Sequence, residues 1–352
     1  MSIRVAIAGA TGYTGLELIK LVLAHPELEL AGVFASPGGR NVGQRLEDTF
    51  AELRGLTDEQ LRSGDAEAIL ACSPRVAFLC TPHEVSATLA PQLVDGCEIV
   101  ADLSGAFRLD ADCYPASYGF VHPAPELLAR AVYALPEHDR QAISQANLLA
   151  CPGCYPTASI LPLKPIVDAG LVASGRRPFI DAVSGISGAG RSPSSRTTYG
   201  EVSLQPYNVF KHRHQPEISQ HAGAAVLFAP SVAPYFRGML AMIHVDCRQG
   251  VTEADLRGAL RAAYEHAPYV RLLPADQWPS IKAVDCTNFA DIALAFDEES
   301  SHVVLACTLD NLLKGASGQA LQAVNIRLGL DERLGLPAAR SCTSQPASEE
   351  VA

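Results

Sequence analysis

The chain has 352 residues, of which 48% are hydrophobic and 18% charged, a composition typical of a globular protein with one large or two ordinary domains. The formal net charge of −11 argues against nucleic acid or an anionic membrane surface as a partner, although a local cluster of Arg and Lys can still hold a small anionic substrate. Ten cysteines at irregular spacing do not resemble a disulfide framework. With no signal-peptide pattern and no apolar run near the ~20 residues that span a bilayer, we expect a cytoplasmic location.

The chain opens with a strand pattern over residues 3–8, a glycine loop over 9–15 and a helix pattern that ends at Pro26. This order is that of the phosphate-binding element of a dinucleotide fold, in which pyrophosphate rests on the helix N-terminus. The spacing is G-x-x-G-x-x-G, a partial match to the usual motif, and a purely structural turn is the alternative. The candidate cofactor residues of this loop are Gly9, Thr11, Gly12, Tyr13, Thr14 and Gly15.

A second strand, residues 29–35, ends without the acidic residue that would hold the ribose 2′-hydroxyl of NAD. Ser36 and Arg40 stand there instead, and they are candidates for binding the 2′-phosphate of NADP. A solvated loop charge is the alternative reading of Arg40.

Further strand patterns over residues 75–80 and 98–103 each end in a polar turn. Ligands of open α/β sheets bind beyond the carboxyl ends of the strands, so Arg108 is a candidate clamp for phosphate or carboxylate. A surface salt bridge is the alternative.

A cysteine stands at a predicted helix start near the middle of the chain, where Gly153 permits a sharp turn and Pro156 fits the first helical turn. Cys154 at that N-terminus would favour the nucleophilic thiolate. Three alternatives compete: a buried structural cysteine, a redox pair with Cys151, and half of a zinc site. No second pair of ligands at zinc spacing is present, and a thioredoxin-like unit would be far shorter.

After another strand pattern, residues 178–184, a second glycine loop covers residues 185–191. Four cationic or titratable groups then precede a predicted helix start at Pro216; they are Lys211, His212, Arg213 and His214. No carboxylate pair nearby completes a metal site. The group is either a solvated basic patch or an acid/base and anion site that would serve Cys154.

The remaining patterns predict an antiparallel sheet and a final helix. Two adjacent long strands are expected over 226–236 and 239–248, and a hairpin over 291–296 and 302–308. Helices are expected from the cap Thr252 to about residue 266 and over 318–328. Residues 339–352, rich in Ser, Pro, Ala and Glu, are expected to form a loose tail.

Taken together, six stretches resemble the N-acetyl-γ-glutamyl-phosphate reductases of arginine biosynthesis, which are relatives of the aspartate-semialdehyde dehydrogenases. Each motif alone is weak, but all six occur in order from residue 3 to about residue 330. The chain departs from the family pattern at Cys151, where Asn is usual, and at Gly105-Ala106. The matching stretches are Gly9–Gly15, Asp102-Leu103-Ser104 with Phe107-Arg108-Leu109, Pro152–Thr157, Ser184-Gly185 with Ser187–Gly190, His212-Arg213-His214 with Pro216-Glu217-Ile218, and Asn311-Leu312 with Lys314-Gly315-Ala316 and Gly318-Gln319-Ala320.

The resemblance implies an α/β protein with a Rossmann dinucleotide-binding domain and an inserted α+β catalytic domain that has a mixed or antiparallel sheet. The expected boundaries are 1–150 with 312–332 for the NADP-binding domain and 151–311 for the catalytic and oligomerisation domain. A homotetramer or homodimer is expected, with no metal.

It also implies NADPH-dependent reductive dephosphorylation of an acyl phosphate to a semialdehyde through a thioester on Cys154. His214 would exchange the proton, with His212 the next candidate, because an imidazole near its usual pKa suits both directions of transfer. The remaining expected contacts are Arg108, Lys211 and Arg213 with the substrate; Ser187, Gly188 and Ala189 with the nicotinamide and substrate pocket; and Asn311 and Lys314 with the cofactor.

Two rival functions stay open at this point. The first is another acyl-phosphate reductase, acting in the aminoadipate branch of lysine biosynthesis or on aspartyl phosphate, since one methylene changes binding by only about 1–3 kcal/mol. A carrier-bound lysine-branch substrate would call for a basic docking face, which a chain of net charge −11 fits poorly. The second is a non-catalytic NADP sensor, which would not need Cys154 and His214 together.

Overall fold

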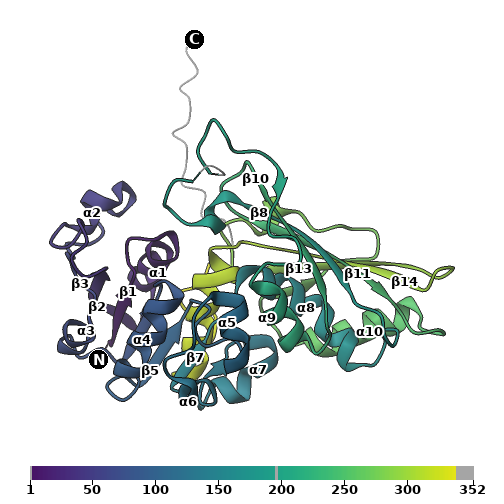
Figure 1. The fold of residues 1–352 in the computed structure, drawn as a ribbon, viewed down its shortest axis with the longest axis horizontal. Helices are drawn as coiled ribbons and strands as arrows, with labels where there is room; N and C mark the ends of the chain where they lie inside the picture. Colours follow the sequence, from purple (N-terminus) through teal and green to yellow (C-terminus); the bar gives the residue numbers. More distant parts are fainter. Residues whose placement is uncertain (1, 195–196, 338–352) are drawn as a thin grey trace, which may run out of the picture.

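A computed structural model describes residues 2–194 and 197–337 and shows two seven-stranded sheets side by side (Figure 1). The predicted tail over residues 339–352 lies outside the described residues.

The first sheet is parallel throughout, in the order β3-β2-β1-β4-β5-β7-β6. The order reverses between β1 and β4, so the crevice beyond their carboxyl ends is the place where such folds bind ligands. The strands are β1 Ile3–Ala8, β2 Leu28–Ala35, β3 Leu61–Ser63, β4 Val76–Leu79, β5 Ile99–Asp102, β6 Val132–Tyr133 and β7 Leu148–Ala150.

Helices cover both faces of this sheet, and its central strands accordingly carry runs of buried apolar residues, Val5–Ala8 in β1 and all of β4. One face packs on α1 (Tyr13–Ala24) and on α12 (Gly318–Arg327) from the far end of the chain. The other face packs on α3 (Ala66–Ala71) and α4 (His83–Leu93).

The second sheet is mixed, in the order β12-β13-β14-β11-β8-β10-β9, with parallel pairs β8–β10 and β12–β13. Helices α8 (Cys154–Asp168), α9 (His214–Ala222) and α10 (Glu253–Tyr264) lie along one face (Figure 1). The strands are β8 Phe179–Gly185, β9 Gln205–Pro206, β10 Leu227–Ala233, β11 Met239–Asp246, β12 Val270–Leu272, β13 Ala290–Asp297 and β14 His302–Leu309.

The prediction of two adjacent strands after residue 226 is wrong in its pairing, because β8 lies between β10 and β11. The short connection between them passes over the end of β8, where the Gly185 N–H donates to the Gly238 carbonyl at 3.0 Å. The predicted hairpin is confirmed as β13 and β14, and Thr252 caps α10 in a capping box with Asp255.

The remaining elements are short and lie in the connections. They are α2 Leu46–Thr49, η1 Ala51–Leu53, η2 Ala111–Cys113, α5 Tyr114–Tyr118, α6 Pro125–Leu128, α7 Pro136–Ile143, η3 Ile186–Ala189, α11 Ile281–Val284 and the π-helical turn η4 Leu313–Ser317.

The chain returns to the first sheet through η4 and α12, and a buried ion pair fixes this return. The Lys314 ammonium lies 2.6 Å from Glu137 Oε1 on α7 and donates to Gln322 Oε1 at 2.8 Å. Both charged side chains are almost fully enclosed, with 0% and 1% of their surface exposed. Removing one partner of such a pair leaves an uncompensated buried charge, which costs roughly 3–5 kcal/mol.

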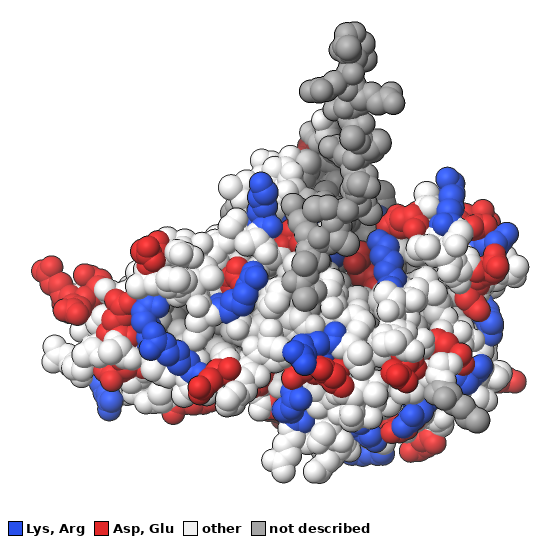
Figure 2. All heavy atoms as spheres, turned by 180° about the vertical axis from the view of Figure 1, so that it is seen from behind, with Lys and Arg blue, Asp and Glu red and all other residues white. Residues whose placement is uncertain are grey.

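The surface carries the acidic excess in dispersed form on the face shown in Figure 2, where basic and acidic side chains alternate over mostly uncharged surface. Ion pairs at the surface include Arg45 with Asp58 and Arg75 with Glu98. Among the described residues, no helix has the length and apolar character that crossing a membrane requires.

Candidate active site

The turn between β7 and α8 positions Cys154. Gly153 is the extended N-cap residue of α8, and the Thr157 N–H donates to its carbonyl at 2.9 Å, so the helix begins at Cys154 as expected. Pro156 lies in the first turn, where its missing N–H removes no helical hydrogen bond. Cys154 lines a cavity of about 440 Å³ at the edge of the second sheet.

Burial opposes the thiolate at this position. Hydrogen bonds from backbone N–H groups at the helix start and the nearby Arg108 charge lower the pKa of Cys154, but desolvation is the largest effect and raises the pKa to about 11. The free site therefore holds a neutral thiol at pH 7, contrary to the expectation from the helix terminus alone. An activated nucleophile here requires a base to remove the proton.

The histidines meet the cysteine through helix α9, which begins at His214, two residues before the predicted start at Pro216. His212 lies just outside the helix, and its Nδ1 accepts a hydrogen bond from the His214 N–H at 3.1 Å. The two rings lie 4.7 Å apart and line the same cavity as Cys154. Arg213, the N-cap residue of α9, lies between them and has helical backbone angles.

His214 packs directly on the cysteine turn. A Cβ atom placed on Gly153 would lie only 2.7 Å from His214 Nε2 and 2.9 Å from Arg108 Nη1. Burial, followed by nearby His212 and the Arg108 charge, lowers the pKa of His214 well below its usual value, and burial lowers that of His212 to about 4. Both imidazoles are therefore neutral at pH 7, and His214 Nδ1 has no hydrogen-bond partner among the described residues.

Arg108 lies behind the cysteine turn and does not line the cavity. Its Nε donates to the Cys151 carbonyl at 2.7 Å, its Nη2 donates to the Leu103 carbonyl at 2.8 Å, and its Nη1 lies 3.4 Å from Glu217 Oε2. These contacts use the donors of the Arg108 guanidinium to hold the cysteine turn. In this structure Arg108 therefore does not face the cavity as the expected anion clamp would.

Glu217 is a site residue to which the sequence had assigned no role. Its buried carboxylate on α9 accepts hydrogen bonds from the Gly153 N–H at 2.9 Å and the Tyr133 hydroxyl at 3.0 Å, and pairs with Arg108. It thus connects the histidine helix to the cysteine turn. The available signal was an acidic residue in the first turn of a helix that follows a cationic run.

The cavity wall opposite these groups comes from the second glycine loop. Gly188 and Ala189 line it, with Lys211 and Arg213 as its cations. Ser187 is buried behind the wall, where its Oγ accepts a hydrogen bond from Asn311 Nδ2 at 2.9 Å. The other lining residues are Ser117, Tyr155, Ser184, Gly185, Ser194, Thr197, Tyr207, Asn208, His212 and Val232.

The first glycine loop combines two structural glycines with one open position. Gly9 has φ +80°, and an added Cβ would lie 2.2 Å from the Cys80 carbonyl oxygen; at Gly15 it would lie 2.5 Å from the Gly9 oxygen. At Gly12, the N-cap of α1, no atom comes nearer than 3.7 Å. No side chain caps this helix, so its first amides and the open space at Gly12 fit an anionic phosphate group.

The other predicted cofactor residues divide into two groups. Ser36 and Arg40 are exposed in the loop after β2, and the Phe34 carbonyl of that strand accepts hydrogen bonds from Gly9 and Ala10 of the glycine loop. Lys314 is different: its ammonium is fully buried and bonded to Glu137 and Gln322, so in this structure it has no exposed surface with which to contact a cofactor.

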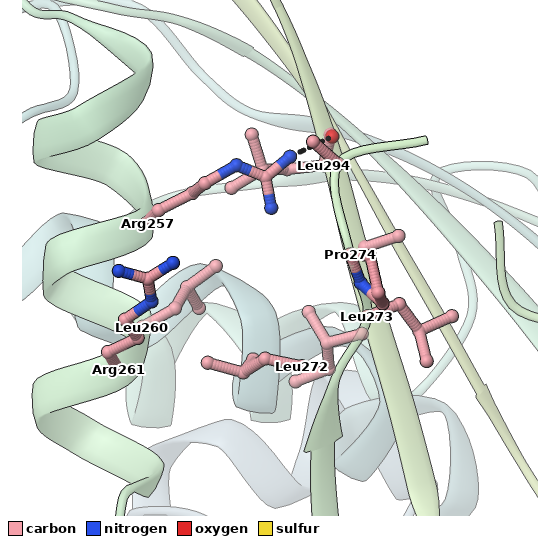
Figure 3. Close-up of a pocket in the computed structure, with 10 residues that line it drawn as sticks. Arg257, Leu260, Arg261, Leu272, Leu273, Pro274 and Leu294 are labelled. Carbon is pink, nitrogen blue, oxygen red and sulfur yellow. Dashed lines mark hydrogen bonds between the residues drawn. The ribbon is translucent and has the colours of Figure 1, made fainter. Parts of the chain in front are cut away.

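Two further groupings lie outside this cavity. Asp285, Cys286 and Asp310 lie close enough to share a cation, but the Arg237 guanidinium already lies 2.8 Å from Asp310 Oδ2. A pocket of about 250 Å³ between α10 and β13 is lined by Arg257, Arg261 and apolar side chains (Figure 3). It contains neither a nucleophile nor a histidine.

Comparisons with known proteins agree across the whole chain. Residues 4–146 match the family described as semialdehyde dehydrogenase, NAD binding domain, and residues 154–311 match the semialdehyde dehydrogenase, dimerisation domain. N-acetyl-gamma-glutamyl-phosphate reductase of Tolumonas auensis is 45% identical over 337 residues, covering 95% of this chain and 99% of the relative. The protein of that name from Escherichia coli K12 is 44% identical over 331 residues, covering 94% and 98%.

Solved structures support the same fold. Aspartate semialdehyde dehydrogenase II from Vibrio cholerae aligns with a TM-score of 0.69 at 18% identity, covering 94% of this chain and 99% of that one. Aspartate semialdehyde dehydrogenase with NADP from Candida albicans gives 0.67 at 16% identity, covering 93% and 98%.

Proposed function

The chain belongs to the N-acetyl-γ-glutamyl-phosphate reductase family, and from that premise we propose how its residues carry out the reaction. It is an oxidoreductase of arginine biosynthesis that converts N-acetyl-γ-glutamyl phosphate to N-acetylglutamate semialdehyde with a nicotinamide dinucleotide. The observation that supports the residue assignment is the shared cavity of Cys154, His214 and His212 with two cationic side chains at its edge.

We assign the nucleophile to Cys154 and the base to His214. The neutral imidazole removes the thiol proton as sulfur attacks the acyl carbon, and the bond from that carbon to the phosphate oxygen breaks. Inorganic phosphate leaves, and a thioester joins Cys154 to the acyl group. The geometry supports this assignment, because His214 lines the cavity of Cys154 and packs on its turn. The lowered pKa of His214 leaves the imidazole unprotonated at pH 7 but also makes it a weaker base than an ordinary histidine.

When bound, the reduced cofactor supplies a hydride to the thioester carbon. His214, now protonated, donates its proton to the oxygen and accepts it back as the carbon–sulfur bond breaks and the aldehyde leaves. Cys154 then recovers a proton. Both proton transfers need a group that exchanges protons easily, and His212, bonded to the His214 backbone, holds the ring pair in position.

The substrate's anionic groups are assigned to Lys211 and Arg213, which line the cavity. Arg108 and Glu217 are assigned to positioning the turn of Cys154 instead. Gly188 and Ala189 would contact the nicotinamide and the substrate, with Ser187 and Asn311 supporting them from behind. Tyr13, Thr14 and Gly15 would offer their amides, and Gly12 its open space, to the cofactor phosphates.

The domain boundaries and the cellular location expected from the sequence are also proposals. We divide the chain into an NADP-binding part, residues 1–150 with 312–332, and a catalytic and oligomerisation part, residues 151–311. We also place the protein in the cytoplasm, on the ground that nine cysteines of the described residues are free thiols.

The first prediction concerns turnover in the reverse direction, with N-acetylglutamate semialdehyde, phosphate and NADP⁺. The wild-type protein should produce NADPH, and aspartate semialdehyde should be a much poorer substrate. Cys154→Ser should abolish turnover but keep dinucleotide binding, because a serine hydroxyl is a far weaker nucleophile here. The matched control, Cys151→Ser, should remain active. Equal losses in the two variants would indicate a dithiol mechanism.

The second prediction concerns the histidines and pH. His214→Asn should lower kcat by roughly 10²–10⁴-fold, with KM within a few-fold, whereas His212→Asn should act mainly on KM. In the wild type, kcat/KM should stay constant through neutral pH and fall only in acid, well below the usual titration range of histidine, because burial lowers the pKa of His214. In His214→Asn it should instead rise about tenfold per pH unit as the thiol, with its pKa of about 11, ionises. A large kcat defect in His212→Asn would exchange the two roles.

The third prediction concerns the choice of cofactor. No acidic residue follows β2, and Ser36 and Arg40 are exposed there, so kcat/KM should be higher with NADPH than with NADH. Arg40→Ala should narrow the difference by roughly 1–3 kcal/mol, the contribution of a charge-assisted hydrogen bond to the 2′-phosphate. Arg130→Ala, at an exposed arginine elsewhere, is the control. Equal kcat/KM for the two cofactors would show that this loop does not read the 2′-phosphate.

The fourth prediction concerns assembly. The face of the second sheet opposite α8 presents partly exposed apolar residues, namely the paired Val183 and Leu240 and the nearby Met242, whose partner on β8 is Asp181. We propose that two copies pair through this face. Met242→Glu should shift the sedimentation coefficient toward that of a monomer, because it places charges in the interface. Ala262→Glu on exposed α10 should sediment like the wild type. An unchanged Met242→Glu oligomer would place the interface elsewhere.

A further inference from the structure

Arg191 connects the second glycine loop to the first. It follows Gly190 at the end of the loop that begins after β8, and its side chain reaches the first sheet. Nη1 donates to the Thr11 carbonyl at 3.2 Å and Nη2 donates to the Thr49 carbonyl at 3.2 Å. The guanidinium carbon lies 4.5 Å from the centre of the Phe50 ring, which orients the plane of its donors.

No carboxylate neutralises this guanidinium among the described residues. The two acidic side chains that line the cavity beside it already have partners: Glu17 pairs with Lys20 and Arg237, and Glu52 pairs with Lys20. Arg191 is exposed, and its recorded acceptors are carbonyl oxygens, which carry only partial charge. A full positive charge therefore remains available to an anion.

The neighbourhood of Arg191 fits a phosphate group. Thr11 directly precedes Gly12, the N-cap of α1, where the space for a Cβ is open and no side chain caps the helix. The first turn of α1 contains no acidic residue. A cavity of about 410 Å³ extends from here, lined by Tyr13, Thr49, Phe50 and Arg191 among others. Helix amides on one side and a guanidinium on the other provide complementary donors for phosphate oxygens.

We propose that Arg191 binds the pyrophosphate of the dinucleotide, supplying a cofactor contact from the loop of the second sheet. This inference rests on the proposed function for the presence of a dinucleotide. The pyrophosphate is favoured over the 2′-phosphate because Arg191 contacts Thr11 at the helix start, whereas Ser36 and Arg40 stand at the end of β2.

The same contact links cofactor binding to the catalytic cavity. Ala189, which lines that cavity beside Cys154, is separated from Arg191 only by Gly190, whose φ of +85° fixes a sharp bend. A pyrophosphate held by Arg191 would also hold the Gly188–Ala189 wall in place. Arg191 therefore acts on the reaction by positioning, in addition to binding.

Fluorescence titration of NADPH and NADH against Arg191→Gln tests the proposal without turnover. We expect the Kd of both dinucleotides to rise by the same factor, about tenfold or more for the loss of a charged hydrogen-bond donor. Arg191→Lys should recover part of the affinity, since lysine keeps the positive charge but lacks the paired donors of the guanidinium. Arg54→Gln, at an exposed arginine near the same cavity, should leave both Kd values unchanged.

Three results would contradict the inference in distinguishable ways. A loss confined to NADPH would assign Arg191 to the 2′-phosphate. Unchanged Kd values with a lower kcat would show that Arg191 only pins the loop. An equal loss of dinucleotide affinity in Arg54→Gln would show that the effect comes from the net charge of the region and not from a contact made by Arg191. A wild-type protein that binds neither dinucleotide would overturn the proposed function itself.

Discussion

The absence of a side chain at Gly153 is the constraint on which the catalytic cavity depends. His214 Nε2 and Arg108 Nη1 both lie where a Cβ at this position would stand, and the Gly153 N–H is bonded to the buried Glu217. One residue thus contacts the imidazole, the guanidinium and the carboxylate, and the next residue is Cys154. A larger residue at position 153 would push α9 away from the cysteine turn, and Cys154 and His214 would no longer line the same cavity side by side.

Close packing also determines the protonation of the site. Gly315 in the returning segment lies so near Cys154 that a Cβ there would be 2.8 Å from the cysteine Cβ. Such packing surrounds the cysteine with protein atoms on this side, so desolvation outweighs the helix amides and raises the pKa of the thiol, while burial lowers the pKa of His214. The Cys154 thiol and the His214 imidazole are thus both neutral in the free protein, so charge would develop on them only when substrate is present.

Local patterns in the sequence predicted the features that depend on neighbours along the chain. The strand, glycine loop and helix of residues 3–24, the helix start at Cys154 and the β13–β14 hairpin all follow from spacing and turn residues. Features set by distant partners were not readable. Lys314 was predicted to contact the cofactor, but its ammonium pairs with Glu137, far away in the sequence. Arg108 was predicted to clamp an anion or to form a surface salt bridge, but its guanidinium forms a buried pair with Glu217. The position of β8 between β10 and β11 is equally a matter of long-range pairing.

The first glycine motif shows that a correctly predicted pattern does not reveal the separate role of each of its residues. Its three glycines look equivalent in the sequence, yet Gly9 and Gly15 are required by contacts with Cys80 and with the loop itself. An added Cβ at Gly12 would make only an ordinary contact, 3.7 Å from the Gly9 oxygen. Packing within the protein therefore does not require Gly12 to lack a side chain, and the open position fits the approach of a ligand from outside. The structural pair would therefore tolerate no side chain in any state of the protein, and the open position becomes restrictive only when a ligand occupies the loop.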